Sequence, residues 1–386
     1  MVAEEAAKQG KKVKVPTNFY SLVAKKHEAE KKEQETQTER ETKLPLEKVS
    51  DTEILYWDDW KPTEFSAKVL KIIGNNVVLD KTEFYPVSGG QVADHGELNG
   101  SYVVDAFKQG GVIVHVLADK PKFKEGDLVK GKVDFARRKQ LAQHHTSTHI
   151  INAAARTILG PHCNQASAKK DIDKAYLDIT HYQTISDDEL LRIEEEANKI
   201  VKNNLPVLKM IIPREEAEKK YGMSIYQGGA VPGKQLRIVE IKGIDVEACG
   251  GTHLNSTGEA EQIKILKSGK VKDGVVRIYF AAGEAAGKII AEEKDRASAV
   301  AKLLACKPEQ VPGRAQELFE KWKKARKAAS KKQPINSDWF VLTSAEEYKG
   351  DIVAKTAEIL QTQPEFIGKT IERFKKDLEE FKKSAK

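Results

Sequence analysis

The sequence predicts an α+β protein in which a small β-barrel precedes an α/β two-layer domain and a mainly helical C-terminal tail. Three observations predict this order. Short strand-like segments recur within 51–136 and are separated by turns rich in Gly and Asn. Helical and strand-like segments then alternate over 137–284, which is typical of layered α+β domains. Residues 285–386 show helical periodicity.

Composition narrows the class of protein further. The chain has 386 residues, a net charge of +7 and three scattered cysteines. No apolar run reaches the roughly 20 residues that cross a bilayer, so no membrane association is expected. Three cysteines cannot form a disulfide framework, which favours a cytoplasmic protein with reduced thiols. The mildly basic charge permits a nucleic-acid partner without requiring one.

The barrel prediction depends on the strands and turns that follow a polar N-terminal region. Residues 25–41 are almost wholly charged or polar, so we interpret them as a linker or a solvated helix. The turn at Gly74-Asn75-Asn76 favours a hairpin. The expected strands of the barrel are 67–73, 77–80, 102–104, 112–117 and 129–135.

Helix signals mark the second domain. A helix is predicted over 141–159 and ends at Gly160-Pro161. Ser186 and Glu189 form a capping box that opens a second helix. Pro213 is expected as the first residue of a third. The expected strands are 235–241, 261–266 and 275–281.

The C-terminal tail is basic and contains a weak internal similarity. Seven basic residues lie from Lys321 to Lys332, and no acidic residue occurs from Lys321 to Ser337. The sequence around Pro308-Glu309 resembles the sequence around Pro364-Glu365. This similarity fits either a true duplication or two ordinary amphipathic helices.

Two ligand-type pairs at helical spacing form the strongest chemical signal. His145 and His149 stand four residues apart on the predicted helix, so both imidazoles can reach one ion. Cys249 and His253 repeat the spacing in the motif Cys-Gly-Gly-Thr-His. Thiolate and imidazole are ligands that zinc prefers, and four of them complete a tetrahedron. The two pairs together predict a zinc site.

The surroundings of these pairs bear on whether the metal is structural or reactive. Four protein ligands are typical of a closed structural site. A Gly-rich turn and nearby hydroxyl and amide groups favour a site that substrate can enter; these groups are Thr146, Thr148, Thr252 and Gln165. The sequence leaves open whether His253 stays on the metal.

The segment Ser88-Gly89-Gly90-Gln91 has two interpretations. It is either a tight turn with a side-chain cap or a loop whose backbone N–H groups approach a phosphate or ester. His144 is expected near the metal pair or at the surface. The other histidines and cysteines are expected to be structural or exposed: His27, His95, His115, His162, His181, Cys163 and Cys306.

Taken together, these motifs resemble the editing domain of alanyl-tRNA synthetases and the free-standing alanyl-tRNA editing proteins. The related threonyl-tRNA synthetase editing domain shares the two spacings but has a different Cys motif and lacks the Gly-Gly-Gln loop. Tyr226 to Gly233 is similar to the archaeal type. The resemblance implies a barrel like that of translation factors. It also implies four regions: a linker or remnant of the tRNA-recognition region at 1–50, the barrel at 51–136, a zinc-dependent editing domain at 137–284 and a basic helical region at 285–386.

The resemblance assigns roles position by position. It implies that Zn²⁺ is held by His145, His149, Cys249 and His253. It places Thr148, Gln165, Gly89 and Gly90 at the catalytic centre, and Ser88, Gln91, Thr146 and Thr252 against the substrate. Where many relatives have Gly-Gly-Gly-Gln, this chain has Ser88 in the first position of the motif. Where many relatives have Gln-x-Gly-Ser or Gln-Ala-Gly-Ala, this chain has Gln-Ala-Ser-Ala, starting at Gln165. Neither change removes a ligand, and both bear on the shape of the pocket.

The implied activity is hydrolysis of Ser-tRNA(Ala), with Gly-tRNA(Ala) as a second target and tRNA(Ala) as the partner. The alternative is a non-catalytic tRNA-binding subunit with a structural zinc. A zinc peptidase is disfavoured because its motif needs Glu where Thr146 stands. The general base is unassigned, although Asp245 and Glu247 lie near the Cys motif in sequence.

No part of the sequence resembles an adenylate-forming core. The chain is therefore expected to be a C-terminal fragment, a subunit of a split synthetase with a separate aminoacylation chain as partner, or a free-standing editor. The sequence leaves the oligomeric state open.

Overall fold

The computed structural model describes residues 43–384 except 228, 230, 232, 332 and 335. The linker or solvated helix expected at 25–41 lies outside the described residues. The chain forms two compact units. The first takes residues up to 146, 164–171 and 205–256, and the second takes 147–163, 172–204 and the residues from 257 onward. We describe each unit by itself.

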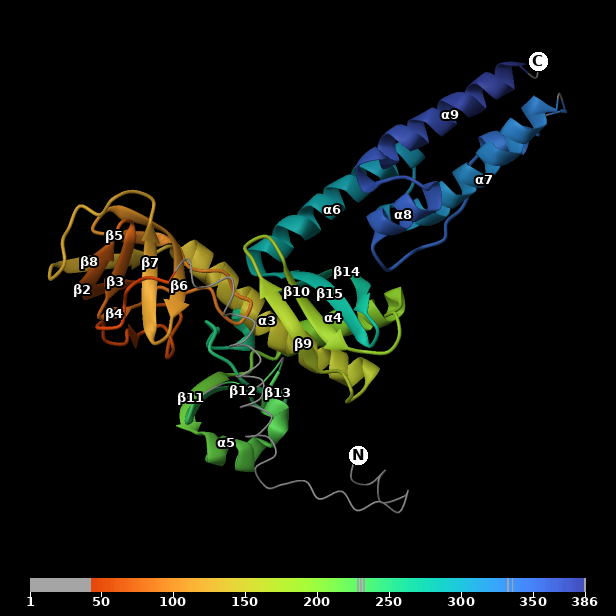
Figure 1. The fold of residues 1–386 in the computed structure, drawn as a ribbon. Helices are drawn as coiled ribbons and strands as arrows, with labels where there is room; N and C mark the ends of the chain where they lie inside the picture. Colours follow the sequence, from red (N-terminus) through yellow and green to blue (C-terminus); the bar gives the residue numbers. More distant parts are fainter. Residues whose placement is uncertain are drawn as a thin grey trace, which may run out of the picture. The chain divides into compact units, whose positions relative to one another are not determined.

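A closed β-barrel belongs to the first unit (Figure 1) and confirms the predicted barrel within a mixed α+β fold. Its strand order is β2-β3-β7-β6-β5-β8. The short strands β1 (Glu53–Ile54) and β4 (Lys81–Thr82) pair in parallel. Alternate side chains face a core that contains Leu79, Leu98 and Leu117. The barrel strands are β2 (Glu64–Ile73), β3 (Asn76–Leu79), β5 (Gly96–Leu98), β6 (Ser101–Gln109), β7 (Val112–Leu117) and β8 (Leu128–Val133).

Two-residue turns set the register of the barrel. Strands β2 and β3 pair up to Ile73 and Asn76, so the turn lies within the segment that the sequence predicted. The β5–β6 turn is Asn99-Gly100, where both residues have positive φ (45° and 76°). This geometry suits the right-handed twist of a hairpin.

Helix α3 (Phe135–Leu159) follows the barrel directly. The Asp134 carboxylate accepts a hydrogen bond from the Arg137 backbone N–H at 3.1 Å and caps its N-terminus. Gly160 follows the helix with a φ of 119°, ahead of Pro161. The helix therefore starts earlier than predicted, because the cap precedes the first periodic apolar residue.

A three-stranded antiparallel sheet completes the first unit. Its order is β11 (Val207–Pro213), β12 (Gln235–Ile241) and β13 (Asp245–Ala248). Helix α5 (Arg214–Tyr221) and the turn η1 (Met223–Ile225) pack against this sheet. Pro213 was expected as the first helical residue, and this was wrong by one position. It pairs with Gln235 in the sheet, so its backbone stays extended and it precedes the helix.

The second unit contains a helix packed on strands. Three of its strands neighbour one another in the order β14 (Ile263–Lys272), β15 (Val275–Ala282) and β10 (Ala175–Thr180), whereas β9 (Gln165–Lys170) belongs to the first unit. Helix α4 (Asp187–Lys202) has the predicted capping box at Ser186. Asn198 on α4 donates to the Ile263 carbonyl at 2.7 Å and accepts from the Ile263 N–H at 2.9 Å. These bonds fix the helix to β14, which follows the short turn η2 (Thr257–Ala260).

The tail is helical and is built from two similar halves. Helices α6 (Gly283–Leu304) and α8 (Ile352–Leu360) are both capped by left-handed residues, Ala305 and Gln361. This shared local structure favours the duplication over two unrelated helices. Each half continues with a 3₁₀ turn that starts with Pro-Glu, η3 (Pro308–Gln310) or η5 (Pro364–Phe366), and then with α7 (Val311–Ser330) or α9 (Ile367–Ser384).

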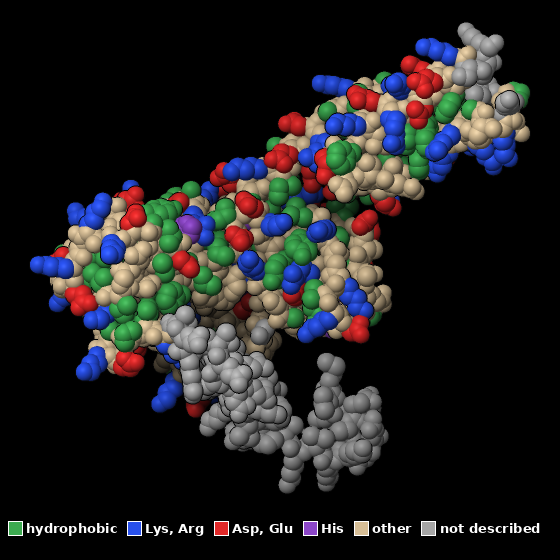
Figure 2. Space-filling view, turned by 45° about the horizontal axis from the view of Figure 1, so that its top comes forward, with side chains coloured by type: hydrophobic (Ala, Val, Ile, Leu, Met, Phe, Trp, Pro, Cys, Tyr) green, Lys and Arg blue, Asp and Glu red, His purple; other side chains and the backbone are tan. Residues whose placement is uncertain are grey.

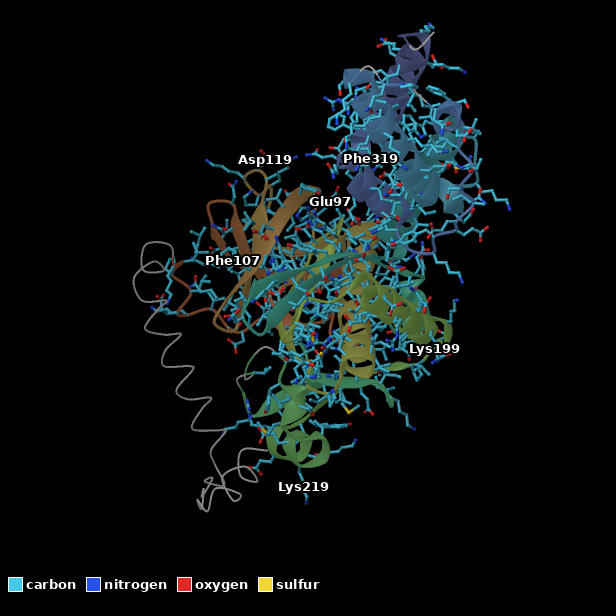
Figure 3. The ribbon with its side chains drawn as sticks, turned by 90° about the vertical axis from the view of Figure 1, so that its right-hand side faces the viewer. Glu97, Phe107, Asp119, Lys199, Lys219 and Phe319 are labelled. Carbon is cyan, nitrogen blue, oxygen red and sulfur yellow. The ribbon has the colours of Figure 1, made fainter. Side chains whose placement is uncertain are left out.

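Aromatic packing joins the two halves of the tail. Trp322 of α7 stacks on Phe374 of α9 with ring centroids 4.2 Å apart, and Phe319 stacks on the same ring. Phe319 lies within the helical part in Figure 3. The turn η4 (Ser337–Phe340) follows α7. Figure 2 shows Lys and Arg side chains interspersed with Asp and Glu over these helices. None of the described helices has the length and apolar composition of a membrane span.

Candidate metal centre

Four predicted ligands come together at one point. Helix α3 carries His145 and His149 one turn apart, and β13 leads directly into Cys249. The donor atoms of these residues and of His253 all lie within 4.8 Å of one another. The three imidazoles are almost fully buried, with 1–2% of their surface exposed. A thiol and three imidazoles at this separation form a set of donors that suits zinc.

Gln91 fixes the ring orientation of His145. The Gln91 amide oxygen lies 2.6 Å from His145 Nδ1, and that oxygen can only accept. Nδ1 is therefore the protonated nitrogen. Nε2 keeps its lone pair and lies 3.3 Å from Cys249 Sγ. The Thr252 hydroxyl lies 2.9 Å from the Gln91 amide nitrogen and helps to hold this amide in place.

Thr146 holds His253 in a similar way. Its hydroxyl lies 3.2 Å from His253 Nδ1 and accepts the Leu254 backbone N–H at 3.1 Å. His253 Nε2 then lies 3.3 Å from Cys249 Sγ. Both histidines therefore direct Nε2 at the same sulfur. In metal sites, contacts to the remote ring nitrogen set the ligand's tautomer and direction.

The Cys motif forms a turn that requires glycine. A Cβ on Gly251 would lie 2.0 Å from His145 Cε1, so a side chain there would displace the imidazole. Arg237 secures the same turn by donating to the Cys249 carbonyl at 2.7 Å and the Gly251 carbonyl at 3.0 Å. Sequence reasoning missed Arg237, because a lone Arg within a strand carries no motif.

The residues present fit a zinc ion. With zinc bonds of about 2.0–2.1 Å to nitrogen and about 2.3 Å to sulfur, a tetrahedron separates nitrogen from sulfur by about 3.6 Å. The two N···S distances of 3.3 Å are close to this value. Lys170 and Arg237 place positive charge near Cys249. Such charge favours the thiolate, which is the form that binds metals.

The loop that precedes Gln91 is a tight turn. The backbones of Ser88 and Gln91 exchange hydrogen bonds of 2.8 and 3.2 Å, and both intervening glycines have positive φ. A Cβ on Gly90 would lie 1.9 Å from the Ala168 carbonyl oxygen, which explains the glycine there. The observed backbone thus matches the tight-turn interpretation. Residues 88–90 stay exposed, whereas Gln91 is fully buried.

Lys170 is a buried cation beside this turn, and sequence reasoning missed it as well. Its ammonium donates to the Gly89 carbonyl at 2.9 Å, and only 1% of its surface is exposed. Burial lowers its pKa, an effect that nearby Cys249 and Glu247 counteract. No motif signals such a residue, because its importance depends on contacts between segments far apart in sequence.

The two residues predicted to line the amino-acid pocket are placed differently. Thr148 is fully buried on α3. Gln165 begins β9 and is half-buried; its backbone N–H donates to the Gln227 side chain at 2.9 Å. Among the described residues, no group hydrogen-bonds the buried Gln165 Oε1, so it is an acceptor that a ligand can satisfy. His144 was expected near the metal pair or at the surface, and it is buried with Nδ1 2.6 Å from the Asp171 carbonyl.

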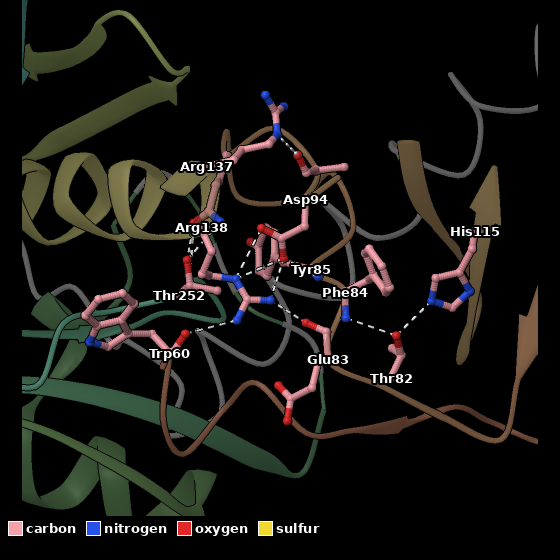
Figure 4. A network of polar contacts seen from close by, with 12 residues as sticks. Trp60, Thr82, Glu83, Phe84, Tyr85, Asp94, His115, Arg137, Arg138 and Thr252 are labelled. Atoms are coloured by element: carbon pink, nitrogen blue, oxygen red, sulfur yellow. Dashed lines mark hydrogen bonds and ion pairs between the residues drawn. The ribbon is translucent and has the colours of Figure 1, made fainter. Parts of the chain in front are cut away.

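A buried ion pair joins the barrel to the start of α3 (Figure 4). Arg138 and Asp94 are both fully buried, and the guanidinium lies 2.5 Å from the carboxylate. Arg138 also donates to the Glu83 and Trp60 carbonyls. The Asp94 carboxylate in turn accepts the Tyr85 backbone N–H at 2.7 Å. This network fixes the direction in which α3 leaves the barrel and so the position of its histidines.

Two family models match parts of this chain. The family model of class II (A) tRNA synthetases matches residues 1–137, and the model of the threonyl and alanyl tRNA synthetase second additional domain matches residues 236–279. The second match includes Cys249 and His253.

Archaeal alanine–tRNA ligases are similar to nearly the whole chain. The enzyme of Methanococcus maripaludis (strain C7) is 45% identical over 335 residues, which are 86% of this chain and 37% of the relative. The enzyme of Pyrococcus abyssi is 43% identical over 387 residues, which are 98% of this chain and 41% of the relative. The chain thus spans about two fifths of the length of these curated relatives. It belongs to the alanyl-tRNA synthetase family and corresponds to a C-terminal part of its members.

Proposed function

We propose that this chain hydrolyses the ester of mischarged Ser-tRNA(Ala), with Gly-tRNA(Ala) as a second substrate, as the editing part or subunit of an alanine–tRNA ligase. The observation that carries the proposal is the convergence of His145, His149, Cys249 and His253 in a chain of this family. The match to a domain shared by threonyl and alanyl tRNA synthetases supports it further.

The four donors would hold a zinc ion. When bound, zinc supplies Lewis acidity that polarises a carbonyl or lowers the pKa of water. The chain's own residues prepare the site for it. Gln91 keeps the proton of His145 on Nδ1, and Thr146 engages Nδ1 of His253. Both imidazoles are thus directed with Nε2 toward Cys249.

Selection of serine over alanine depends on one hydroxyl group. A site that hydrogen-bonds this hydroxyl discriminates strongly, because alanine leaves the buried polar groups of the site without a partner. Gln165 Oε1 is such a group. Thr148 is our second candidate for this contact, and Thr252 lies beside the ligands through its bonds to Gln91.

The exposed turn at 88–90 is our candidate for contact with the end of the tRNA. Ser88, Gly89 and Gly90 are exposed, and the backbone there carries no bulky side chain. The Gly89 carbonyl is held by Lys170 at 2.9 Å, so a buried group supports the turn. The Gln91 amide is engaged by His145 and Thr252, so we assign it to the support of a ligand rather than to the substrate.

A second candidate function is tRNA binding with a structural zinc, in support of a separate aminoacylation chain. Four protein donors with almost no exposed surface on the histidines favour this function, because structural zinc sites are closed in this way. The basic segment of α7 suits tRNA in either case.

Substitution of the thiol ligand tests the proposal. Cys249→Ala should lower the deacylation rate of Ser-tRNA(Ala) at least about 100-fold, as expected for loss of an interaction with the reacting centre, while tRNA binding persists. Cys306→Ala is the matched control, since Cys306 packs in the helical tail. If the folded wild-type chain binds zinc and tRNA but leaves the ester intact, the structural-zinc function is correct instead.

A further inference from the structure

A second group of metal-type donors lies in the second unit. His162 Nε2 is 2.9 Å from His181 Nδ1, and Cys163 Sγ is 3.7 Å and 3.9 Å from these two nitrogens. From the sequence, these three residues were expected to be structural or exposed, each by itself. The structure instead brings them together, because the turn after α3 lies beside the end of β10.

Local contacts hold this group in place. The Thr180 hydroxyl donates to the His162 carbonyl at 2.6 Å, which ties the turn to the last residue of β10. The Cys163 backbone N–H donates to the Gly160 carbonyl at 3.1 Å. Tyr182 packs on both imidazoles, with ring centroids 5.3 Å and 4.9 Å from His162 and His181. The protein's own contacts therefore bring the donors together.

The separations resemble those around a tetrahedral ion. With zinc bonds of about 2.0–2.1 Å to nitrogen and about 2.3 Å to sulfur, nitrogens lie about 3.3 Å apart and nitrogen and sulfur about 3.6 Å. The distances of 2.9, 3.7 and 3.9 Å depart from these values only slightly.

We propose that His162, Cys163 and His181 form a second binding site for a zinc-class divalent ion, separate from the four-ligand centre. Two imidazoles and one thiolate are ligands that suit zinc and cobalt. The Cys163 thiol gives up its proton when the ion binds. Cys163 and His181 are buried, whereas His162 is exposed, so the group of donors borders solvent.

Cobalt titration of the metal-free full chain tests this site. A thiolate bound to Co²⁺ gives a charge-transfer band in the near ultraviolet, and each proposed site has one thiolate. The Cys249→Ala chain lacks the thiolate of the first site, yet it should still develop this band. The Cys249→Ala/Cys163→Ala chain should lose the band.

Two further double variants test whether the band comes from Cys163 and its neighbouring histidine. Cys249→Ala/Cys306→Ala is the matched control and should keep the band, because Cys306 lies among the tail helices. Cys249→Ala/His181→Ala should bind cobalt more weakly, and thermal unfolding followed by circular dichroism reports whether it is folded. A folded Cys249→Ala chain that gives no charge-transfer band overturns the proposal. This readout is independent of deacylation, so the proposed function and the second site can fail separately.

Discussion

Gln91 acts on the candidate metal centre through one ligand. Its amide oxygen accepts from His145 Nδ1 and leaves Nε2 free of a proton, and its amide nitrogen is held by Thr252. The residue is fully buried, so no water can replace the amide without a rearrangement. We therefore assign Gln91 as a positioning residue for His145.

Replacing Gln91 should weaken metal binding. Gln91→Ala removes the contact that sets the His145 tautomer, and loss of such contacts costs about 10–100-fold in metal affinity. Competition with a chromophoric chelator measures this change. Gln109→Ala is the matched control, because Gln109 makes two hydrogen bonds to Leu44 at the barrel. Unchanged zinc affinity in Gln91→Ala would contradict the positioning role.

For single residues, the sequence could predict the metal ligands but not the residues that hold these ligands in position. The four donors stand at helical spacing within two short motifs, so local pattern identifies them. Arg237 and Lys170 act through carbonyl groups at Cys249, Gly251 and Gly89, and these contacts exist only in the folded chain. The cluster at Cys163 was missed for the same reason.

The first unit contains two buried groups whose neutral forms are favoured by folding (Figure 4). Burial raises the pKa of Glu83 to about 7. Burial lowers the pKa of His115 to about 4, and its ring is held by Thr82 at 2.8 Å. Folding therefore favours the neutral form of both the Glu83 carboxyl group and the His115 imidazole.

Each group should give the free energy of unfolding its own pH dependence. The unfolded chain releases the Glu83 proton first as pH rises, so this group lowers stability between about pH 5 and 7 by about 2 kcal/mol. The unfolded chain protonates His115 first as pH falls, so this group raises stability from about pH 5 to 7 by a similar amount, about 2 kcal/mol. The two contributions nearly cancel in the wild-type chain.

Single substitutions should separate these contributions. Glu83→Gln should make the chain gain stability over this pH interval relative to wild type, and His115→Gln should make it lose stability over the same interval. Denaturant unfolding at about pH 5 and pH 7 measures the free energy of unfolding of each variant. The difference between the two pH values is compared with that of wild type, so any loss of stability that the substitution causes equally at both pH values cancels. Two variants with the same slope as wild type would contradict the pKa assignments.

Helix α7 should contribute to tRNA binding through its exposed cations. Lys324→Ala/Lys327→Ala removes two exposed charges from a segment that contains no acid. The affinity for tRNA should fall, and the slope of log K against log salt should flatten by about 1–2, as expected when about two phosphate contacts are lost. Lys199→Ala/Lys202→Ala on α4 removes the same charge and is the matched control. Equal losses in both chains would contradict a specific role of α7.

At the scale of elements, prediction succeeded where local signals are strong. The barrel hairpins, the capping box of α4 and the tail helices all have turn or cap chemistry in the sequence. Strand β9 was missed because Gln-Ala-Ser-Ala-Lys-Lys has no apolar alternation, and its last residue, Lys170, bonds to the backbone of Gly90 and Val92. Pairing partners distant in sequence cannot be predicted from such a segment.

The whole chain combines an editing-type domain with a helical tail whose two halves have similar local structure. Its similarity to alanine–tRNA ligases covers 86–98% of the chain but 37–41% of the relatives. Co-purification with a chain that carries an aminoacylation domain would test the split-synthetase alternative directly.

The proposed function requires that this chain hydrolyse the mischarged ester in preference to the correct one. The most direct measurement compares the initial rates at which the zinc-loaded chain releases the amino acid from Ser-tRNA(Ala) and from Ala-tRNA(Ala). We predict a preference for serine of at least about 100-fold, because only serine satisfies a buried hydrogen-bonding site. Equal rates for the two esters, or no hydrolysis of either by a folded and zinc-loaded chain, would contradict it.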